Sequence, residues 1–208
     1  MTKGILVVTW SGGEEPCTLL LKSLWNVSYP VFIVVNDAHN MDKGAWKRLY
    51  RLSGEQNWTL HANDKDSFEI GAIDIVLNNT NWSELVILQD TFEIKDQKVF
   101  DLLFDSPKSV MYNPYFQMYL GKFKREVLEK MRPFPEIKTK RDSVKQEWDF
   151  TKRYRDIDRD MTVFNPAFDD SNFLNNFHEM FGRNNMVLED QYLIKRKGTW
   201  NATQLGEE

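Results

Sequence analysis

The feature that most constrains the fold is a short apolar run, Leu85 to Leu88, followed directly by Gln89, Asp90 and Thr91. Four consecutive apolar residues are typical of a strand that is covered on both faces, as in the middle of a parallel sheet. No turn residue follows, so an amide, a carboxylate and a hydroxyl lie where the strand leaves the core. Ligands bind at the carboxyl ends of strands in open α/β sheets. An isolated acid after a strand more often caps a turn, so the other segments must decide between these interpretations.

Strand and helix patterns alternate on both sides of this run. A buried strand is predicted over Gly4–Trp10, a helix from Glu14, and a second strand over Val31–Val35, which together form a βαβ unit. The other predicted elements are helices over 41–52, 68–77, 96–104 and 123–131, and strands over 57–62, 110–112 and 116–120, the last ended by Gly121. The charged segment 137–160 is predicted to be a peripheral helix or a segment over a cleft. The fold class is therefore α/β, with an open, mostly parallel mixed sheet and helices on both faces.

The composition is that of a globular protein. Hydrophobic residues make up 41% and aromatic residues 13% of the 208 residues, which excludes a disordered chain. No apolar run approaches the roughly 20 residues that span a bilayer, and the N-terminus lacks the pattern of a signal peptide. We therefore expect one domain over residues 1–208, with no membrane contact and a cytoplasmic location, which is the host-cell cytoplasm if the protein is viral. The oligomeric state cannot be predicted.

Charge is distributed unevenly along the chain. The net charge is -4, from 27 basic and 31 acidic residues. Between Lys122 and Asp160 there are 13 basic and 9 acidic residues, a local +4, which leaves 14 against 22, or -8, elsewhere. A basic surface beside an acidic body suits a phosphate-bearing partner. A mixed charged run is more often a solvated helix face, so both interpretations stay open.

The order of strands and their polar ends resembles the nucleotide-binding half of the GT-A glycosyltransferases over residues 4–125. The chain contains no Gly-x-x-x-x-Gly-Lys, Gly-x-Gly-x-x-Gly or His-Glu-x-x-His motif and no cysteine pair, so kinase, NAD-enzyme and zinc classes have no support. The resemblance implies a GT-A-like fold. It also implies that residues 1–125 bind the nucleotide sugar and that residues 126–208 form an acceptor and closing half.

The resemblance assigns roles to residues at three strand ends. In that family the turn after the first strand holds the base and ribose, which matches Thr9, Trp10 and Ser11. The acid after the second strand contacts the nucleoside, which matches Asp37. The Asp-x-Asp motif binds the divalent cation that bridges the donor diphosphate, and its counterpart is Gln89–Asp90–Thr91.

This counterpart departs from the motif, because Gln89 replaces the first acid. Asp90 is implied as the ligand of Mn²⁺ or Mg²⁺, since one carboxylate can hold such an ion when phosphate oxygens and water complete the octahedron. A cation fixed there would stabilise the negative charge that develops on the diphosphate as the sugar leaves.

Later residues are candidates for the remaining roles. Asp149, with Glu147 as the second choice, is predicted to deprotonate an acceptor hydroxyl, although both acids could equally be solvated. His178 could complete the metal sphere, but the edge of an aromatic cluster is its commoner setting. Three residues of the basic segment Lys195–Trp200, namely Lys195, Lys197 and Trp200, are predicted to close over the diphosphate, with a solvated terminus as the alternative.

The resulting hypothesis is a metal-assisted glycosyltransferase that moves a sugar from a nucleotide sugar, a UDP-sugar such as UDP-glucose, to an acceptor hydroxyl. The local positive charge makes DNA a candidate acceptor, for example a hydroxymethylated pyrimidine in viral DNA, and a glycan or small molecule is the alternative. Two other classes stay open. A nucleotidyltransferase shares the βαβ architecture but usually carries a cationic loop after the first strand, which Trp10–Glu15 lacks. The loss of one motif acid also allows a non-catalytic nucleotide-sugar-binding protein.

Overall fold

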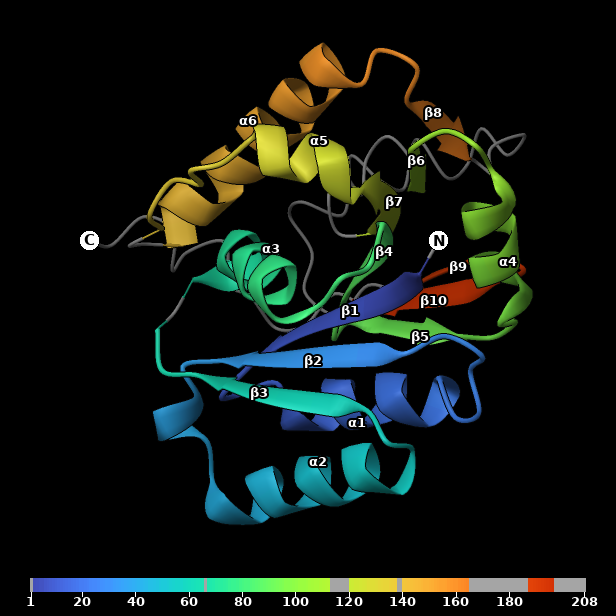
Figure 1. Ribbon diagram of the computed structural model, residues 1–208. Coiled ribbons are helices and arrows are strands. Elements are labelled where there is room, and N and C mark those ends of the chain that lie inside the picture. Colours follow the sequence, from blue (N-terminus) through green and yellow to red (C-terminus); the bar gives the residue numbers. More distant parts are fainter. Residues whose placement is uncertain (1, 66, 113–119, 138–139, 165–186, 197–208) are drawn as a thin grey trace.

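A seven-stranded open sheet forms the centre of the computed structural model, which describes residues 2–65, 67–112, 120–137, 140–164 and 187–196. Its strand order is β3-β2-β1-β4-β7-β6-β8 (Figure 1). The strands are β1 (Lys3–Trp10), β2 (Val31–Asn36), β3 (Thr59–Asn63), β4 (Glu84–Gln89), β6 (Val110–Tyr112), β7 (Leu120–Lys124) and β8 (Thr162–Phe164). β7 is antiparallel to its neighbours β4 and β6, and the other neighbouring pairs are parallel. The predicted mixed, mostly parallel α/β sheet is confirmed.

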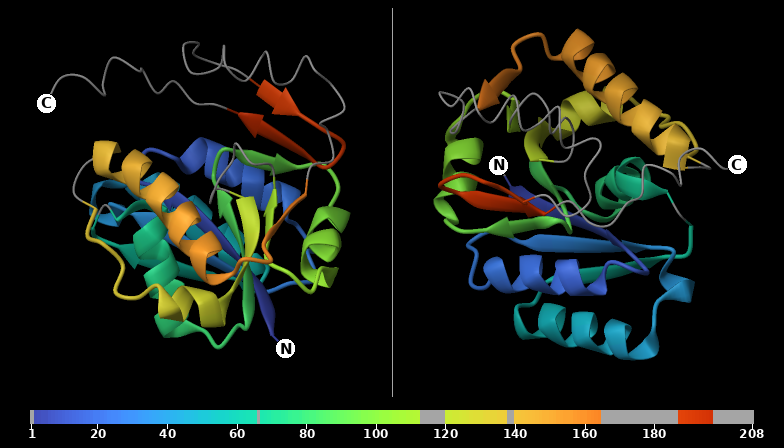
Figure 2. Two further views of the ribbon diagram at one scale, coloured as in Figure 1. Left: turned by 90° about the horizontal axis from the view of Figure 1, so that it is seen from above. Right: turned by 180° about the vertical axis from the view of Figure 1, so that it is seen from behind.

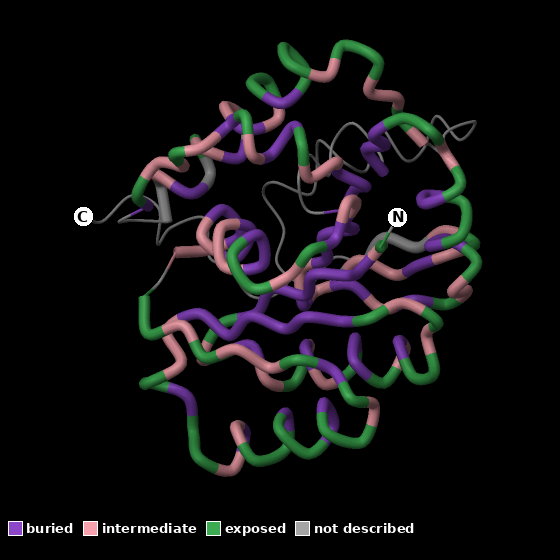
Figure 3. Tube along the Cα trace, viewed as in Figure 1, coloured by how far each residue is buried: buried purple, intermediate pink, exposed green. Residues whose placement is uncertain are grey.

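Helices cover both faces of this sheet, as predicted. The helices are α1 (Glu14–Ser23), α2 (Lys43–Glu55), α3 (Phe68–Asn79), α4 (Lys98–Asp105), α5 (Arg125–Lys130) and α6 (Lys140–Ile157), with a 3₁₀ turn at Ala38–Asn40. Residues of α1, α2 and α4 pack with Ile5 and Val7 on one face of the sheet, and residues of α3, α5 and α6 pack with Leu6 and Val8 on the other (Figures 1 and 2). Alternate side chains of β1 point into the two cores, so both faces of the strand are buried (Figure 3). This explains why the strand is continuously apolar.

A small antiparallel sheet stands beside the main one. It has the order β5-β10-β9, with β5 (Phe92–Ile94), β9 (Val187–Glu189) and β10 (Leu193–Arg196). Only two residues separate the end of β4 from the start of β5, so the strand that pairs with β5 is held close to the end of β4. In this register Lys195 of β10 stands opposite Phe92 of β5.

Two predicted boundaries around Gly121 are wrong. Gly121 does not end a strand, because β7 begins at Leu120 and runs through it. A Cβ at Gly121 would lie 2.8 Å from the carbonyl oxygen of Val110, so glycine allows β6 to approach closely. The helix predicted from residue 123 begins instead at Arg125, because Phe123 still pairs with Leu85 of β4. Residues 116–119 lie outside the described part of the chain.

The sequence prediction also missed four short strands, β5, β8, β9 and β10. Each has only three or four residues, which is too short for a strand periodicity to be recognised. Within the described ranges, no helix has the length and apolar character needed to cross a membrane.

Candidate functional site

Polar side chains meet at the carboxyl ends of β1 and β2. The Ser11 hydroxyl donates a hydrogen bond to Oδ2 of Asp37 over 2.8 Å. Asp37 follows β2 in the left-handed backbone region, with φ 54° and ψ 36°, and its Oδ1 accepts a hydrogen bond from Asn40 over 2.8 Å. The carboxylate remains partly exposed, with a side-chain exposure of 27%. The structure therefore brings two of the predicted nucleoside-binding residues into direct contact.

Trp10 presents an aromatic surface beside this pair. Its residue exposure is 43%, high for a tryptophan. A Cβ at Gly12 would lie 2.5 Å from the indole ring, so the ring folds over the Gly12 backbone. The glycine permits this arrangement, and an exposed aromatic face next to a carboxylate is a suitable surface for a nucleoside base and ribose.

Asp90, the predicted metal ligand, is buried against the start of α1. Its exposure is 8%, and its Oδ2 accepts a hydrogen bond from the hydroxyl of Thr9 over 2.7 Å. A Cβ at Gly13 would lie 2.3 Å from the same oxygen, which places the carboxylate at the N-terminus of α1. Burial and the charge of Asp90 together raise the pKa of the Cys17 thiol in this helix. Asp90 thus stabilises the positive end of the α1 dipole.

Gln89 and Thr91, the neighbours of Asp90, contact a different group. The Lys195 ammonium donates a hydrogen bond to Oε1 of Gln89 over 2.8 Å and another to the hydroxyl of Thr91. The same ammonium lies 4.3 Å from the ring centroid of Phe92, within cation–π range. The side-chain amide of Gln89 in turn donates to the carboxylate of Glu69 at the start of α3.

Glu147 of α6 completes this group of side chains, which we call the β4-end cluster: Glu69, Gln89, Thr91, Glu147 and Lys195. Glu147 has an exposure of 3%, and its Oε1 accepts a hydrogen bond from Ser143 over 3.4 Å. Burial raises the pKa of Glu147 to about 9, with a further increase from the charge of Glu69 and an opposing decrease from Lys195. At neutral pH the carboxyl of Glu147 therefore keeps its proton and can donate a hydrogen bond.

The two acids that were predicted to deprotonate the acceptor hydroxyl lie on different sides of α6. Successive helix residues are rotated by about 100°, so Asp149 points about 160° away from Glu147 around α6. Glu147, Phe150 and Tyr154 form the buried side of α6, and Asp149 is half-buried. Only Glu147 joins the β4-end cluster, and the role of Asp149 as a base stays a prediction.

Of the predicted late residues, only Lys195 is described. His178, Lys197 and Trp200 lie outside the described residues. Sequence reasoning missed Glu69 as a member of the cluster, and it named Thr91 only as the third residue of the triplet. One signal in the sequence could have indicated Glu69: it is an acid in the first turn of a mainly apolar helix that follows a strand of the sheet.

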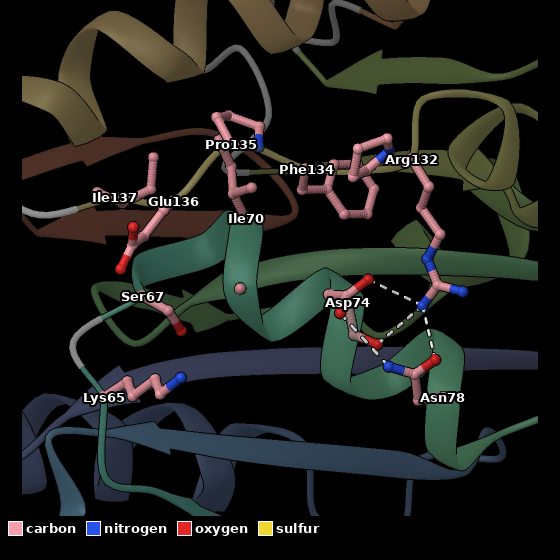
Figure 4. A pocket seen from close by; sticks show the side chains of 12 residues that line it. Lys65, Ser67, Ile70, Asp74, Asn78, Arg132, Phe134, Pro135, Glu136 and Ile137 are labelled. Atoms are coloured by element: carbon pink, nitrogen blue, oxygen red, sulfur yellow. Dashed lines mark hydrogen bonds and ion pairs between the residues drawn. The ribbon is translucent and has the colours of Figure 1, made fainter.

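A pocket of about 1070 Å³ lies elsewhere, between α3 and the segment from Arg132 to Ile137 (Figure 4). At one end the Arg132 guanidinium is paired with Asp74 at 2.9 Å and donates a hydrogen bond to Oδ1 of Asn78 over 2.9 Å. The pocket does not include Asp37, Asp90 or Lys195. The pocket is therefore separate from the candidate site at the strand ends.

Comparison with known proteins agrees with this architecture. No family profile and no curated protein matches the chain. Among solved structures, S. aureus TarS 1-349 has a TM-score of 0.61 at 13% identity, and the match covers 79% of this chain and 58% of TarS 1-349. The chain has the GT-A fold.

Two further structures show that this fold is shared by different activities. The mannosyltransferase PcManGT from Pyrobaculum calidifontis, in complex with GDP-Man and Mn²⁺, has a TM-score of 0.51 at 16% identity, with 63% of this chain and 47% of PcManGT covered. A putative glucose-1-phosphate thymidylyltransferase from Bacillus anthracis has a TM-score of 0.53 at 6% identity, with 80% of this chain and 87% of that chain covered. This chain spans only about half the length of the matched mannosyltransferase. The likeness establishes the GT-A fold and leaves the activity to the site.

The side chains at the end of β4 do not fit the divalent cation that the GT-A resemblance implies. Asp90 is bound to Thr9 at the α1 N-terminus, and the oxygens of Gln89 and Thr91 already face an ammonium. In the described part of the chain, no group of three or more His, Cys, Asp or Glu side chains could hold a metal ion. A hard divalent cation requires several oxygen ligands, preferably charged, and this arrangement offers it an opposing positive charge instead.

Proposed function

We propose that this chain transfers a glycosyl group from a UDP-sugar to an acceptor hydroxyl. The observation that carries the proposal is the Ser11–Asp37 pair beside exposed Trp10, on the same sheet edge as the β4-end cluster with its Lys195 ammonium. A nucleoside would lie against the first group and a diphosphate beside the second. TarS has been solved in complex with UDP-GlcNAc, which supports a UDP-sugar as the donor to test first.

Each group has a chemical task in this proposal. Asp37 would accept hydrogen bonds from ribose hydroxyls, and the Trp10 ring would pack against the base. The diphosphate would leave with the electron pair of the broken C1–O bond, and a nearby cation would stabilise it. A divalent cation is not part of the proposal, because the residues at the end of β4 do not fit one.

The acceptor is proposed from charge. The segment from Lys122 to Asp160, with its local +4, includes α6, where Lys145, Lys152 and Arg155 are exposed. A hydroxymethylated pyrimidine in DNA is therefore the acceptor to test first. Binding to DNA must weaken as salt rises, because counterions are released from phosphates. Transfer that is indifferent to salt would instead favour a glycan or small molecule.

The test is turnover of UDP-glucose and UDP-GlcNAc, followed by NMR, with uridine and UDP affinities measured by calorimetry. We expect slow release of free sugar and UDP. Release of pyrophosphate from a nucleoside triphosphate and a sugar 1-phosphate would identify a nucleotidyltransferase instead, and UDP binding without any turnover would identify a binding protein. Either result contradicts the proposal.

Asp37→Asn tests the nucleoside site directly. The variant removes the charged acceptor, so we expect about a tenfold or greater loss of affinity for both uridine and UDP. Asp105→Asn is the matched control. Asp105 is exposed at the end of α4, where Phe104 accepts a hydrogen bond from Lys3 at the opposite edge of the sheet. Equal affinities of the Asp37 variant and the wild type would refute the assignment.

A further inference from the structure

Glycosyl transfer requires a positive charge beside the donor diphosphate. The bond between sugar C1 and a diphosphate oxygen breaks, and its electron pair stays on that oxygen. The acceptor oxygen forms the new bond to C1, and its proton passes to a carboxylate base, for which Asp149 is the prediction. The UDP that leaves carries one more negative charge than the bound donor, and a metal ion or a protonated side chain can stabilise it.

Lys195 already places such a charge at the end of β4. Its ammonium lies between the side-chain oxygens of Gln89 and Thr91, the two residues that flank Asp90. Gln89 and Thr91 are neutral, so these two contacts orient the ammonium and do not neutralise it. The pairing of β10 with β5 fixes the backbone of Lys195 opposite Phe92, and the Phe92 ring supports the cation at 4.3 Å.

Two acidic residues of the β4-end cluster also lie near the Lys195 ammonium. The charge of Lys195 acts on Glu147, and Gln89 links the ammonium to Glu69 on α3. Lys195 is only partly buried, unlike Lys122 of β7, whose side chain is fully covered. A phosphate oxygen at the sheet edge could therefore reach Lys195.

We propose that Lys195 supplies the positive charge that stabilises the donor diphosphate, in place of a divalent cation, and that donor binding and transfer require no metal ion. This inference rests on the proposed function, because the diphosphate is that of the UDP-sugar. An ammonium is a compact point charge with three donors, and it suits phosphate oxygens.

The competing explanation is that Lys195 only attaches the small sheet to the end of β4. The two explanations differ in what they predict for the phosphates. A structural attachment affects the whole site, so its loss weakens uridine and UDP binding alike. A phosphate contact affects UDP alone. The ratio of UDP affinity to uridine affinity therefore separates them.

The experiment measures both affinities by calorimetry in EDTA and again with Mn²⁺, for the wild type and three variants. Lys195→Gln removes the charge and Lys195→Arg keeps it. Lys95→Gln is the matched control, because the exposed Lys95 ammonium donates to the backbone oxygen of Asp190 over 2.8 Å and thus also joins β5 to the segment before β10.

We expect the wild type to bind UDP equally well in EDTA and in Mn²⁺, and at least tenfold more tightly than uridine. Lys195→Gln should lower UDP affinity by about 10- to 100-fold and leave uridine affinity unchanged, Lys195→Arg should restore most of the ratio, and Lys95→Gln should match the wild type. UDP-glucose turnover should likewise persist in EDTA.

Three results would overturn the inference while leaving the proposed function standing. The first is a tenfold or larger gain in wild-type UDP affinity with Mn²⁺. The second is an unchanged ratio of UDP affinity to uridine affinity in Lys195→Gln, and the third is an equal loss of both affinities in that variant. If the wild type binds neither ligand in either buffer, the proposed function itself fails.

Discussion

The buried carboxyl of Glu147 allows the electrostatics of the β4-end cluster to be tested without a substrate. Burial, and secondly the charge of Glu69, raise the pKa of this carboxyl in the folded protein from its ordinary 4.5 to about 9. Replacing the residue by Gln keeps its size and its ability to accept from the Ser143 hydroxyl. The substitution removes only the titration, so the pH dependence of stability should change in a calculable way.

The sign follows from proton binding. Below about pH 4.5 both the folded and the unfolded chain hold this proton. Between about pH 4.5 and 9 the unfolded chain releases it and the folded chain keeps it, so the free energy of unfolding falls by about 1.4 kcal/mol per pH unit. From pH 4.5 to pH 7.5 this contribution amounts to a loss on the order of 4 kcal/mol, and the loss levels off above about pH 9.

Urea unfolding of the wild type and Glu147→Gln at pH 5, 6, 7 and 8 measures this difference. We expect the variant to be more stable by about 1 kcal/mol or less at pH 5 and by on the order of 4 kcal/mol at pH 7 to 8. Asp149→Asn is the control, because Asp149 lies in the same helix but is only half-buried. This variant should show the same dependence of stability on pH as the wild type. A stability difference between Glu147→Gln and wild type that stays constant with pH would refute the reasoning.

Two further substitutions test the β1–α1 turn. Asp90→Asn keeps an acceptor for the Thr9 hydroxyl but removes the charge at the α1 N-terminus. We expect a loss of about 1 kcal/mol in urea unfolding and an unchanged UDP affinity in EDTA. A large loss of UDP affinity in EDTA would identify Asp90 as a donor ligand. Gly13→Ala would place a Cβ 2.3 Å from Oδ2 of Asp90 and 2.6 Å from Oγ1 of Thr9, so we expect a loss of about 1–3 kcal/mol by the same measurement. Wild-type stability of this variant would show that the carboxylate is not packed there.

The part of the fold that the sequence predicted is the part built from long, continuously buried segments. β1, β2 and β4 are apolar on both faces, and each ends where polar residues begin, so their positions and their common edge could be inferred. The same pattern placed Ser11 and Asp37 at that edge. Side chains that follow adjacent parallel strands must lie close together, whatever the loops do.

The part that could not be predicted depends on contacts between distant residues. Lys195 and Gln89 are 106 residues apart, and their contact exists only because β10 pairs with β5. Both strands are too short to leave a periodic pattern. Glu147 was chosen as a secondary candidate, but nothing in a charged helix indicates which of its acids faces the core.

The triplet Gln89–Asp90–Thr91 shows how local geometry changes the interpretation of a motif. Gln89 is the last residue of β4, and Asp90 and Thr91 form the turn before β5. In this turn the side chains of Gln89 and Thr91 both contact Lys195, whereas Asp90 contacts Thr9. The two positions of the triplet that contact Lys195 therefore carry neutral oxygens, and its one acid contacts a different group. Neutral oxygens hold a divalent cation weakly but orient an ammonium well. The replacement of the first motif acid by Gln89 and the presence of Lys195 beside it are therefore consistent with each other.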